Sequence, residues 1–135
     1  MAKTLRAKCL EALQLLVRVK AANDNGYCKC VTCGIEKPWN EMDGGHFIPK
    51  GSSSYLALVE ENVHPQCKGC NGFGMKHGSA AQEYTLWMIK TYGKDEVDRM
   101  LADKRNIIKI YKKEYEEMLK DFNEQIKYHK KRIGA

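Results

Sequence analysis

Residues 30–34 read CVTCG and residues 67–71 read CKGCN, so the chain holds two cysteine pairs of identical spacing. Two thiolates separated by two residues can bind one metal ion from a single tight turn. Four thiolates complete the closed tetrahedral shell that structural Zn²⁺ prefers, and such a site contributes folding energy. The two pairs therefore predict a structural zinc site with four ligands: Cys30, Cys33, Cys67 and Cys70.

Two further cysteines need an interpretation. Cys28 lies close enough in sequence to replace Cys30 as a ligand, although the C-x-x-C-G spacing favours Cys30. Cys9 falls within an apolar helical pattern, where we expect a small buried core residue.

The composition is typical of a soluble domain. The chain has 135 residues and a net charge of +6. A positive charge favours polyanionic partners, because each neutralised phosphate releases counterions. No apolar run reaches the roughly 20 residues of a membrane span, and the charged N-terminus is unlike a signal peptide. We therefore expect a cytoplasmic protein with no membrane partner. In that reducing compartment, paired cysteines bind metal more often than they form disulfides.

Helical patterns flank the cysteine region on both sides. Thr4 can cap a helix that runs to about Ala22, and a second helix is expected over residues 80–92, with Gly93 at its end. The absence of Pro and Gly predicts one long helix over residues 95–132. Its apolar stripe fits a partner helix and the chain's own N-terminal helix equally well. The stripe consists of Val97, Leu101, Ile108, Tyr111, Tyr115, Met118, Phe122 and Ile126.

The segment between the cysteine pairs predicts a β-hairpin with strands near residues 43–48 and 55–59. A short helix is expected next, with Pro65 in its first turn and with Cys67 and Cys70 on one face. The expected fold is therefore α+β and mostly helical. It forms one domain over residues 1–135, divided into an N-terminal helix (1–26), a zinc-bound core (27–78) and C-terminal helices (79–135).

The motifs in this segment resemble those of the HNH, or ββα-metal, nucleases. Residues 45–49 (GHFIP) are similar to the first motif, Asn62 to the central asparagine, and residues 67–71 to the last motif. A closer resemblance is to the phage lambda NinG (Rap) recombination nucleases. It rests on the strings C-x-x-C-G, D-x-G-H-F-I-P and N-V-H-P-Q-C-x-x-C-N, and it covers roughly residues 27–93. The resemblance implies a ββα-metal core and a metal-dependent endonuclease that cuts branched DNA such as Holliday junctions, in the host cytoplasm if phage-encoded.

The resemblance also implies roles for individual residues. His46 becomes the general base, because a neutral imidazole accepts a proton from water near neutral pH. Asn62 joins it in the catalytic motif, where we expect it to pin the loop by bonding backbone groups. A catalytic Mg²⁺, or Mn²⁺ in its place, needs oxygen ligands, and Asn71 supplies one of them.

The second oxygen ligand is where this chain departs from the pattern. Many relatives carry Asp or His directly before the catalytic histidine, whereas this chain has Gly45. Asp43 lies two residues earlier, on the same face of a regular strand, and a bulge at the glycines would bring it closer. Asp43 is therefore the expected ligand, with His64 and His77 as alternatives.

The expected partner is DNA. Lys50, Lys68 and Lys76 are candidate phosphate contacts, and His64 is expected either to contact phosphate or to cap the short helix. A homodimer is expected, because a two-fold junction needs paired nicks. Two other functions remain open: a non-catalytic zinc module that binds nucleic acid or protein, and an HNH restriction or homing-type nuclease that cuts duplex DNA.

Overall fold

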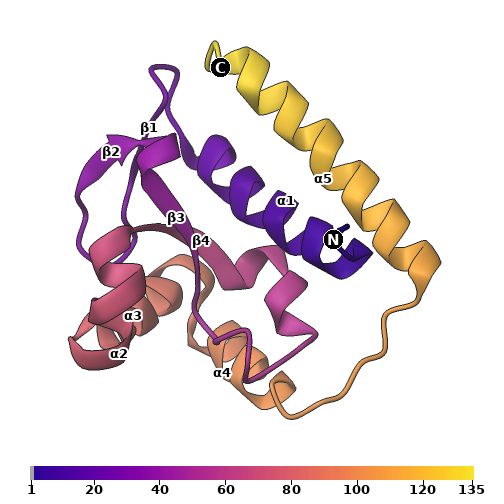
Figure 1. The fold of residues 1–135 in the computed structure, drawn as a ribbon. Coiled ribbons are helices and arrows are strands. Elements are labelled where there is room, and N and C mark those ends of the chain that lie inside the picture. Colours follow the sequence, from indigo (N-terminus) through magenta and orange to yellow (C-terminus); the bar gives the residue numbers. More distant parts are fainter. Residues whose placement is uncertain (1) are drawn as a thin grey trace.

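The computed structural model describes residues 2–135 and shows a mixed α+β fold that is mostly helical (Figure 1). Two small antiparallel sheets lie among five helices. In chain order, the elements are α1 (Leu5–Ala21), β1 (Tyr27–Lys29), β2 (Glu36–Pro38), β3 (Met42–His46), β4 (Val63–Cys67), α2 (Met75–His77), α3 (Ala80–Tyr92), α4 (Lys94–Asp103) and α5 (Lys112–Arg132). None of the helices in this described range is both long and apolar enough to cross a membrane.

Helices α1 and α5 run side by side in the same direction (Figure 1). The Thr4 side chain accepts a hydrogen bond from the amide of Ala7 at 3.1 Å, which caps α1 as predicted. Leu13 and Leu16 of α1 pack in one buried cluster with Phe122 and Ile126 of α5. The apolar stripe of the C-terminal region therefore packs on the chain's own N-terminal helix, which is one of the two alternatives left open by the sequence.

The central hairpin pairs β3 with β4, and its register runs from Met42 opposite Cys67 to His46 opposite Val63. The first strand was predicted, but the second strand predicted at residues 55–59 is wrong. Those residues include a buried single turn, Leu56–Leu58. A short apolar run indicates that its side chains are buried, but it does not indicate whether the backbone forms a strand or a turn.

The short helix after the hairpin also begins later than predicted. Pro65 lies within β4, where a two-stranded sheet tolerates a residue without an N–H group. Helical structure starts at Lys68, continues as a π-helix over Cys70–Gly74, and ends in α2. Cys67 therefore ends a strand while Cys70 lies on a helical turn, and the prediction that they share one helical face is wrong.

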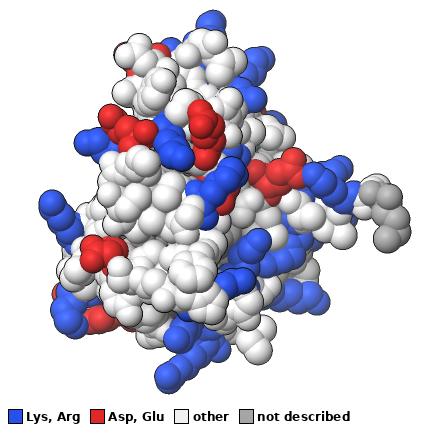
Figure 2. Space-filling model, turned by 60° about the vertical axis from the view of Figure 1, so that its left-hand side comes forward, with Lys and Arg blue, Asp and Glu red and all other residues white. Residues whose placement is uncertain are grey.

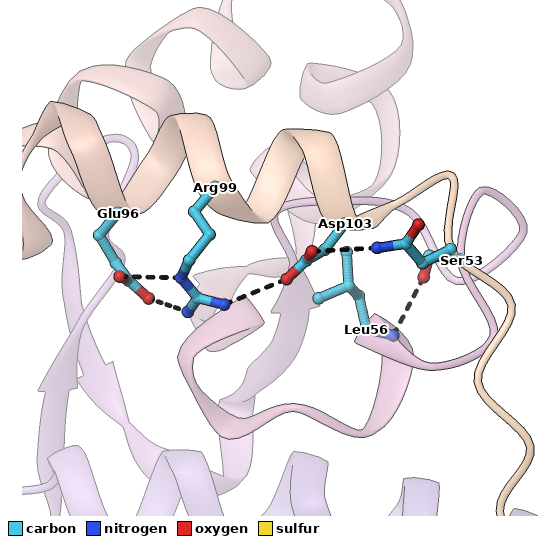
Figure 3. A network of polar contacts seen from close by, with 6 residues as sticks. Ser53, Leu56, Glu96, Arg99 and Asp103 are labelled. Carbon is cyan, nitrogen blue, oxygen red and sulfur yellow. Dashed lines mark hydrogen bonds and ion pairs between the residues drawn. The ribbon is translucent and has the colours of Figure 1, made fainter.

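The C-terminal region contains α3 as predicted, with the amide of Gly93 bonded to the carbonyl of Ile89 at 2.9 Å. The single helix predicted over residues 95–132 is wrong, because residues 106–111 are not helical and separate α4 from α5. This segment reads NIIKIY, and its β-branched residues lower helix propensity. Figure 3 shows one side of α4, where Arg99 lies between Glu96 and Asp103 and pairs with both.

Candidate metal centre and adjoining groove

The four predicted zinc ligands come together. The sulfur atoms of Cys30, Cys33, Cys67 and Cys70 all lie within 4.8 Å of one another. Cys28 is buried outside this cluster, so the structure selects Cys30 over Cys28. Four cysteine sulfurs are a donor set that fits a structural zinc ion.

Backbone contacts hold the first cysteine pair against the second. The amide of Val31 donates to the carbonyl of Pro65 at 3.0 Å, which ties the turn to β4. Gly34 closes the turn with a φ of +79°, a conformation that favours glycine, and its amide bonds to the carbonyl of Cys30 at 2.9 Å. The predicted zinc-knuckle turn is therefore present, and it is attached to the hairpin by main-chain hydrogen bonds.

The thiol pKa values support metal binding. Burial alone raises the pKa of Cys30, but hydrogen bonds from the Thr32 hydroxyl and from nearby backbone amides outweigh it and lower that pKa to about 6. Burial and the neighbouring sulfurs Cys67 and Cys33 raise the pKa of Cys70 to about 12. The Cys30 side chain is therefore a thiolate at neutral pH. A bound cation would stabilise the thiolate form of the other three cysteines as well.

His46 ends β3 with a side chain that is only 9% exposed. Its Nε2 lies 2.9 Å from the carbonyl oxygen of Ala57, which can only accept, so Nε2 carries the proton and Nδ1 keeps a lone pair. Burial lowers the pKa of His46, and the charge of Lys50 lowers it further, against partial opposition from the Ala57 bond. The imidazole is therefore neutral at neutral pH, which is the state a general base requires.

His46 lines a cavity of about 480 Å³, here called the His46 cavity, together with Asn71, Lys50 and Lys76. A second cavity of about 270 Å³, the Asp43 cavity, is lined by Asp43, Asn71, Lys68 and Arg18. The two cavities adjoin and form one groove, because the same three residues line both of them: Gln14, Gly44 and Asn71.

The two predicted oxygen ligands meet in this groove. The Asn71 side-chain amide donates to Asp43 at 3.1 Å, which leaves the amide oxygen of Asn71 available. Lys68 pairs with the other carboxylate oxygen of Asp43 at 2.7 Å. Burial opposes ionisation of Asp43, but the bonds from Lys68 and Asn71 and the nearby positive charges outweigh it, so its pKa is lowered. Two side chains with oxygen atoms, the type of ligand that hard divalent cations prefer, therefore lie side by side in the groove.

The structure explains why this chain has glycine before His46. A Cβ atom on Gly45 would lie 1.7 Å from the side-chain oxygen of Gln66, which is buried against it. The position that carries Asp or His in many of the nucleases that this segment resembles therefore has no room for a side chain. Among the residues described, Asp43 is the carboxylate of β3 that lines the groove.

Asn62 is fully buried and bonds three backbone groups. Its side chain accepts from the amide of Ile48 at 2.8 Å and donates to the carbonyls of Ile48 and Leu56, each at 3.0 Å. These bonds pin the segment that follows His46. Asn62 therefore holds the backbone at Ile48 and Leu56, and it does not line the groove.

The two histidines expected as alternative ligands, His64 and His77, lie outside the groove. His64 bonds Tyr84 through Nδ1 at 3.0 Å and Tyr92 through Nε2 at 2.8 Å, and burial lowers its pKa to about 4. With both nitrogens engaged and the ring neutral, His64 does not fit the expected phosphate contact or helix cap. His77 is exposed on α2 and stacks near Phe73. The structure therefore brings neither alternative ligand to Asp43.

Tyr84 connects His64 to the strand that carries His46. Its hydroxyl donates to the carbonyl of Gly45 at 2.8 Å. That bond uses the only hydroxyl proton of Tyr84, so the Tyr84 oxygen must accept a hydrogen bond from Nδ1 of His64. The Nε2 atom of His64 then has no proton and accepts from the hydroxyl of Tyr92. The backbone directly before His46 is thus held by a buried hydrogen-bond relay.

Replacing Tyr84 with phenylalanine is expected to lower the free energy of unfolding by about 1–3 kcal/mol, because it leaves the buried carbonyl of Gly45 and the partly buried imidazole N–H of His64 unpaired. Denaturant unfolding followed by circular dichroism measures this change. Tyr128→Phe is the control, since that side chain is 66% exposed, and it is expected to leave stability unchanged. Equal stability of both variants would show that the relay does not stabilise the fold.

The groove residues on α1, among others, were not found by sequence reasoning. Gln14 and Arg18 are one helical turn apart on α1, so their shared face was visible in the sequence. Nothing local indicated that this face meets β3.

The structure is that of a small α+β protein in which four clustered cysteines are positioned to bind a metal ion such as zinc, beside a polar groove. The family model described as Bacteriophage Lambda NinG protein matches residues 3–132, and the chain belongs to this family. The resemblance found in residues 27–93 thus extends over both flanking helical regions. Comparison with curated proteins and with solved structures gives no significant match.

Proposed function

We propose that this protein is a metal-dependent, structure-selective DNA endonuclease of the HNH type that cuts branched recombination intermediates such as Holliday junctions. The observation that carries the proposal is His46, a buried neutral imidazole with a free Nδ1, in one groove with Asp43 and Asn71. Membership of the NinG family supports it. The net charge of +6 suits a DNA partner, and Figure 2 shows lysine and arginine side chains around the lower edge of one face.

The reaction would be hydrolysis of a phosphodiester. His46 Nδ1 takes a proton from water, the water oxygen forms a bond to phosphorus, and the bond to one ester oxygen breaks. Lys50 and Lys76 line the His46 cavity and offset the phosphate charge. Asp43 and Asn71 would hold the divalent cation, Mg²⁺ or Mn²⁺, which when bound supplies positive charge for the phosphate and the leaving oxygen.

The test is cleavage of a labelled four-way junction and a linear duplex of matched sequence, with Mg²⁺ and with Mn²⁺. We expect metal-dependent cutting of the junction in preference to the duplex. Equal cutting of both would favour the alternative of a duplex-cutting HNH nuclease. Binding without cutting under any metal would favour a non-catalytic zinc module, which needs only the cysteine cluster and the basic surface.

We also propose a homodimer, since paired nicks in a junction require two sites. The buried stripe of α5 is already covered by α1, so the dimer contact would use another surface. Light scattering with and without junction DNA tests this, and a monomer mass in both conditions would rule it out.

A further inference from the structure

Arg18 lies in helix α1, outside the region that carries the nuclease motifs, yet its side chain lines the Asp43 cavity. Figure 1 shows how this arises, because α1 lies between the β3–β4 hairpin and α5. We propose that Arg18 binds a phosphate of the DNA backbone in the Asp43 cavity, so that the N-terminal helix forms part of the substrate site. This inference rests on the proposed function and names a contact within it.

The guanidinium of Arg18 is held in place by the protein itself. Its Nε donates to the carbonyl of Gln14 at 2.9 Å and its Nη1 to the carbonyl of Met42 at 3.3 Å. Its Cζ lies 5.8 Å from the centre of the Trp39 ring. A cation fixed in this way loses little further freedom when a ligand binds, which favours affinity.

Among the residues that the structure describes, the same guanidinium forms no ion pair, although the charge of Asp43 in the same cavity acts on it at longer range. Asp43, the acidic residue of this cavity, forms its ion pair with Lys68, and within residues 2–135 no carboxylate lies within ion-pair distance of Arg18. Among the same residues, the Nη2 atom of Arg18 also has no hydrogen-bond partner. A half-buried cation is costly when it is unpaired. Phosphate oxygens would satisfy both the charge and the free donor, and they match the guanidinium geometry.

The charges along the groove indicate a polyanion as the ligand. Four cations line the two cavities against one carboxylate. Arg18 and Lys68 line the Asp43 cavity, while Lys50 and Lys76 line the His46 cavity. Because the two cavities adjoin, a strand that binds with one phosphate in the His46 cavity would continue toward the Asp43 cavity and Arg18.

The test measures junction binding by fluorescence anisotropy without Mg²⁺ over a range of salt concentrations. Arg18→Gln removes the charge but keeps an amide that can donate to a carbonyl. We expect about tenfold weaker binding and a slope of log affinity against log salt that is smaller by about one. Arg18→Lys keeps the charge but removes the planar guanidinium and its several N–H donors. We therefore expect an unchanged salt slope and several-fold weaker binding.

Arg132→Gln is the matched control. Arg132 also donates to two carbonyls of the α1 region, those of Val19 and Ala22, but it does not line the groove. We expect its variant to keep the wild-type slope and affinity. Wild-type slope and affinity in a folded Arg18→Gln variant would overturn the inference, and if that variant does not fold, wild-type affinity of Arg18→Lys would overturn it.

The result is separable from the nuclease proposal. A wild-type protein that binds the junction with the Arg18 effect but never cuts it would refute the nuclease and leave the phosphate contact standing. A protein that cuts the junction while Arg18→Gln binds normally would refute only the contact.

Discussion

Replacing His46 with alanine is expected to lower the rate of Mg²⁺-dependent DNA cleavage by about 10² to 10⁴-fold, the usual contribution of a general base. The reason is positional as well as chemical. The carbonyl of Ala57 fixes the ring through Nε2 and leaves Nδ1 as the nitrogen that can accept a proton. Single-turnover cleavage of a labelled junction measures the rate, with zinc content and DNA affinity determined on the same preparation.

His77→Ala is the matched control for this experiment. His77 is exposed and lies outside the groove, so its loss is expected to leave the rate unchanged. A zinc-loaded, folded His46→Ala variant that cut the junction at the wild-type rate would exclude His46 as the base. Equal losses in both variants would indicate a general effect on the fold.

The pH dependence of cleavage follows from the environment of His46. Burial lowers its pKa from the ordinary value of 6.5, and only the neutral ring can accept a proton. A lower pKa means that the neutral form persists to lower pH. We therefore expect kcat/KM to fall on the acid side with a midpoint below 6.5, measured while zinc remains bound. A midpoint above that value would contradict the buried neutral state.

The second large effect is expected at the zinc centre. Replacing Cys67 with serine removes one of four clustered sulfurs and should abolish zinc binding. Structural zinc sites bind with about 10–16 kcal/mol in peptides, which matches or exceeds the 5–15 kcal/mol (roughly) that stabilises a whole domain. The buried cluster beside the sulfurs is small, with Ala22, Cys28, Cys30 and Met42 as its fully buried members. We therefore expect residues 27–78, which contain the cysteine cluster, to unfold in the Cys67→Ser variant.

Zinc per chain by atomic emission and the near-ultraviolet circular dichroism of the same samples measure this outcome. Cys28→Ala is the control, because Cys28 is buried beside the cluster but outside the set of four. It is expected to keep one zinc ion per chain and to lose only packing energy. Loss of zinc from Cys28→Ala with retention in Cys30→Ala would reverse the ligand assignment.

The features that the sequence predicted correctly have local causes. The spacing within each cysteine pair, the cap at Thr4 and the helix end at Gly93 each depend on a few neighbouring residues. These signals were sufficient to predict the metal-binding cysteines and the helices α1 and α3.

The features that were predicted wrongly depend on distant contacts. Whether residues 55–59 or Val63–Cys67 pair with β3 is decided by packing across the whole core, and the segment that does pair, VHPQC, is the less apolar of the two. The division of the C-terminal helix reflects two separate clusters, since Met100 of α4 packs with Phe47 and Phe122 of α5 packs with Leu13. The place of Arg18 in the groove likewise depends on how α1 lies across the hairpin.

The pairing of α1 with α5 has a consequence for how the chain is made. During translation α1 leaves the ribosome long before α5, yet Leu13, Leu16 and Val17 are covered in part by Phe122 and Ile126. A nascent chain that has not yet reached residues 112–132 therefore carries an uncovered apolar helix face. A stop codon or ribosome stalling before α5 would leave a fragment with an exposed apolar helix face that is prone to aggregate. Synthesis of α5 is therefore the step that protects α1 from aggregation and from binding by chaperones.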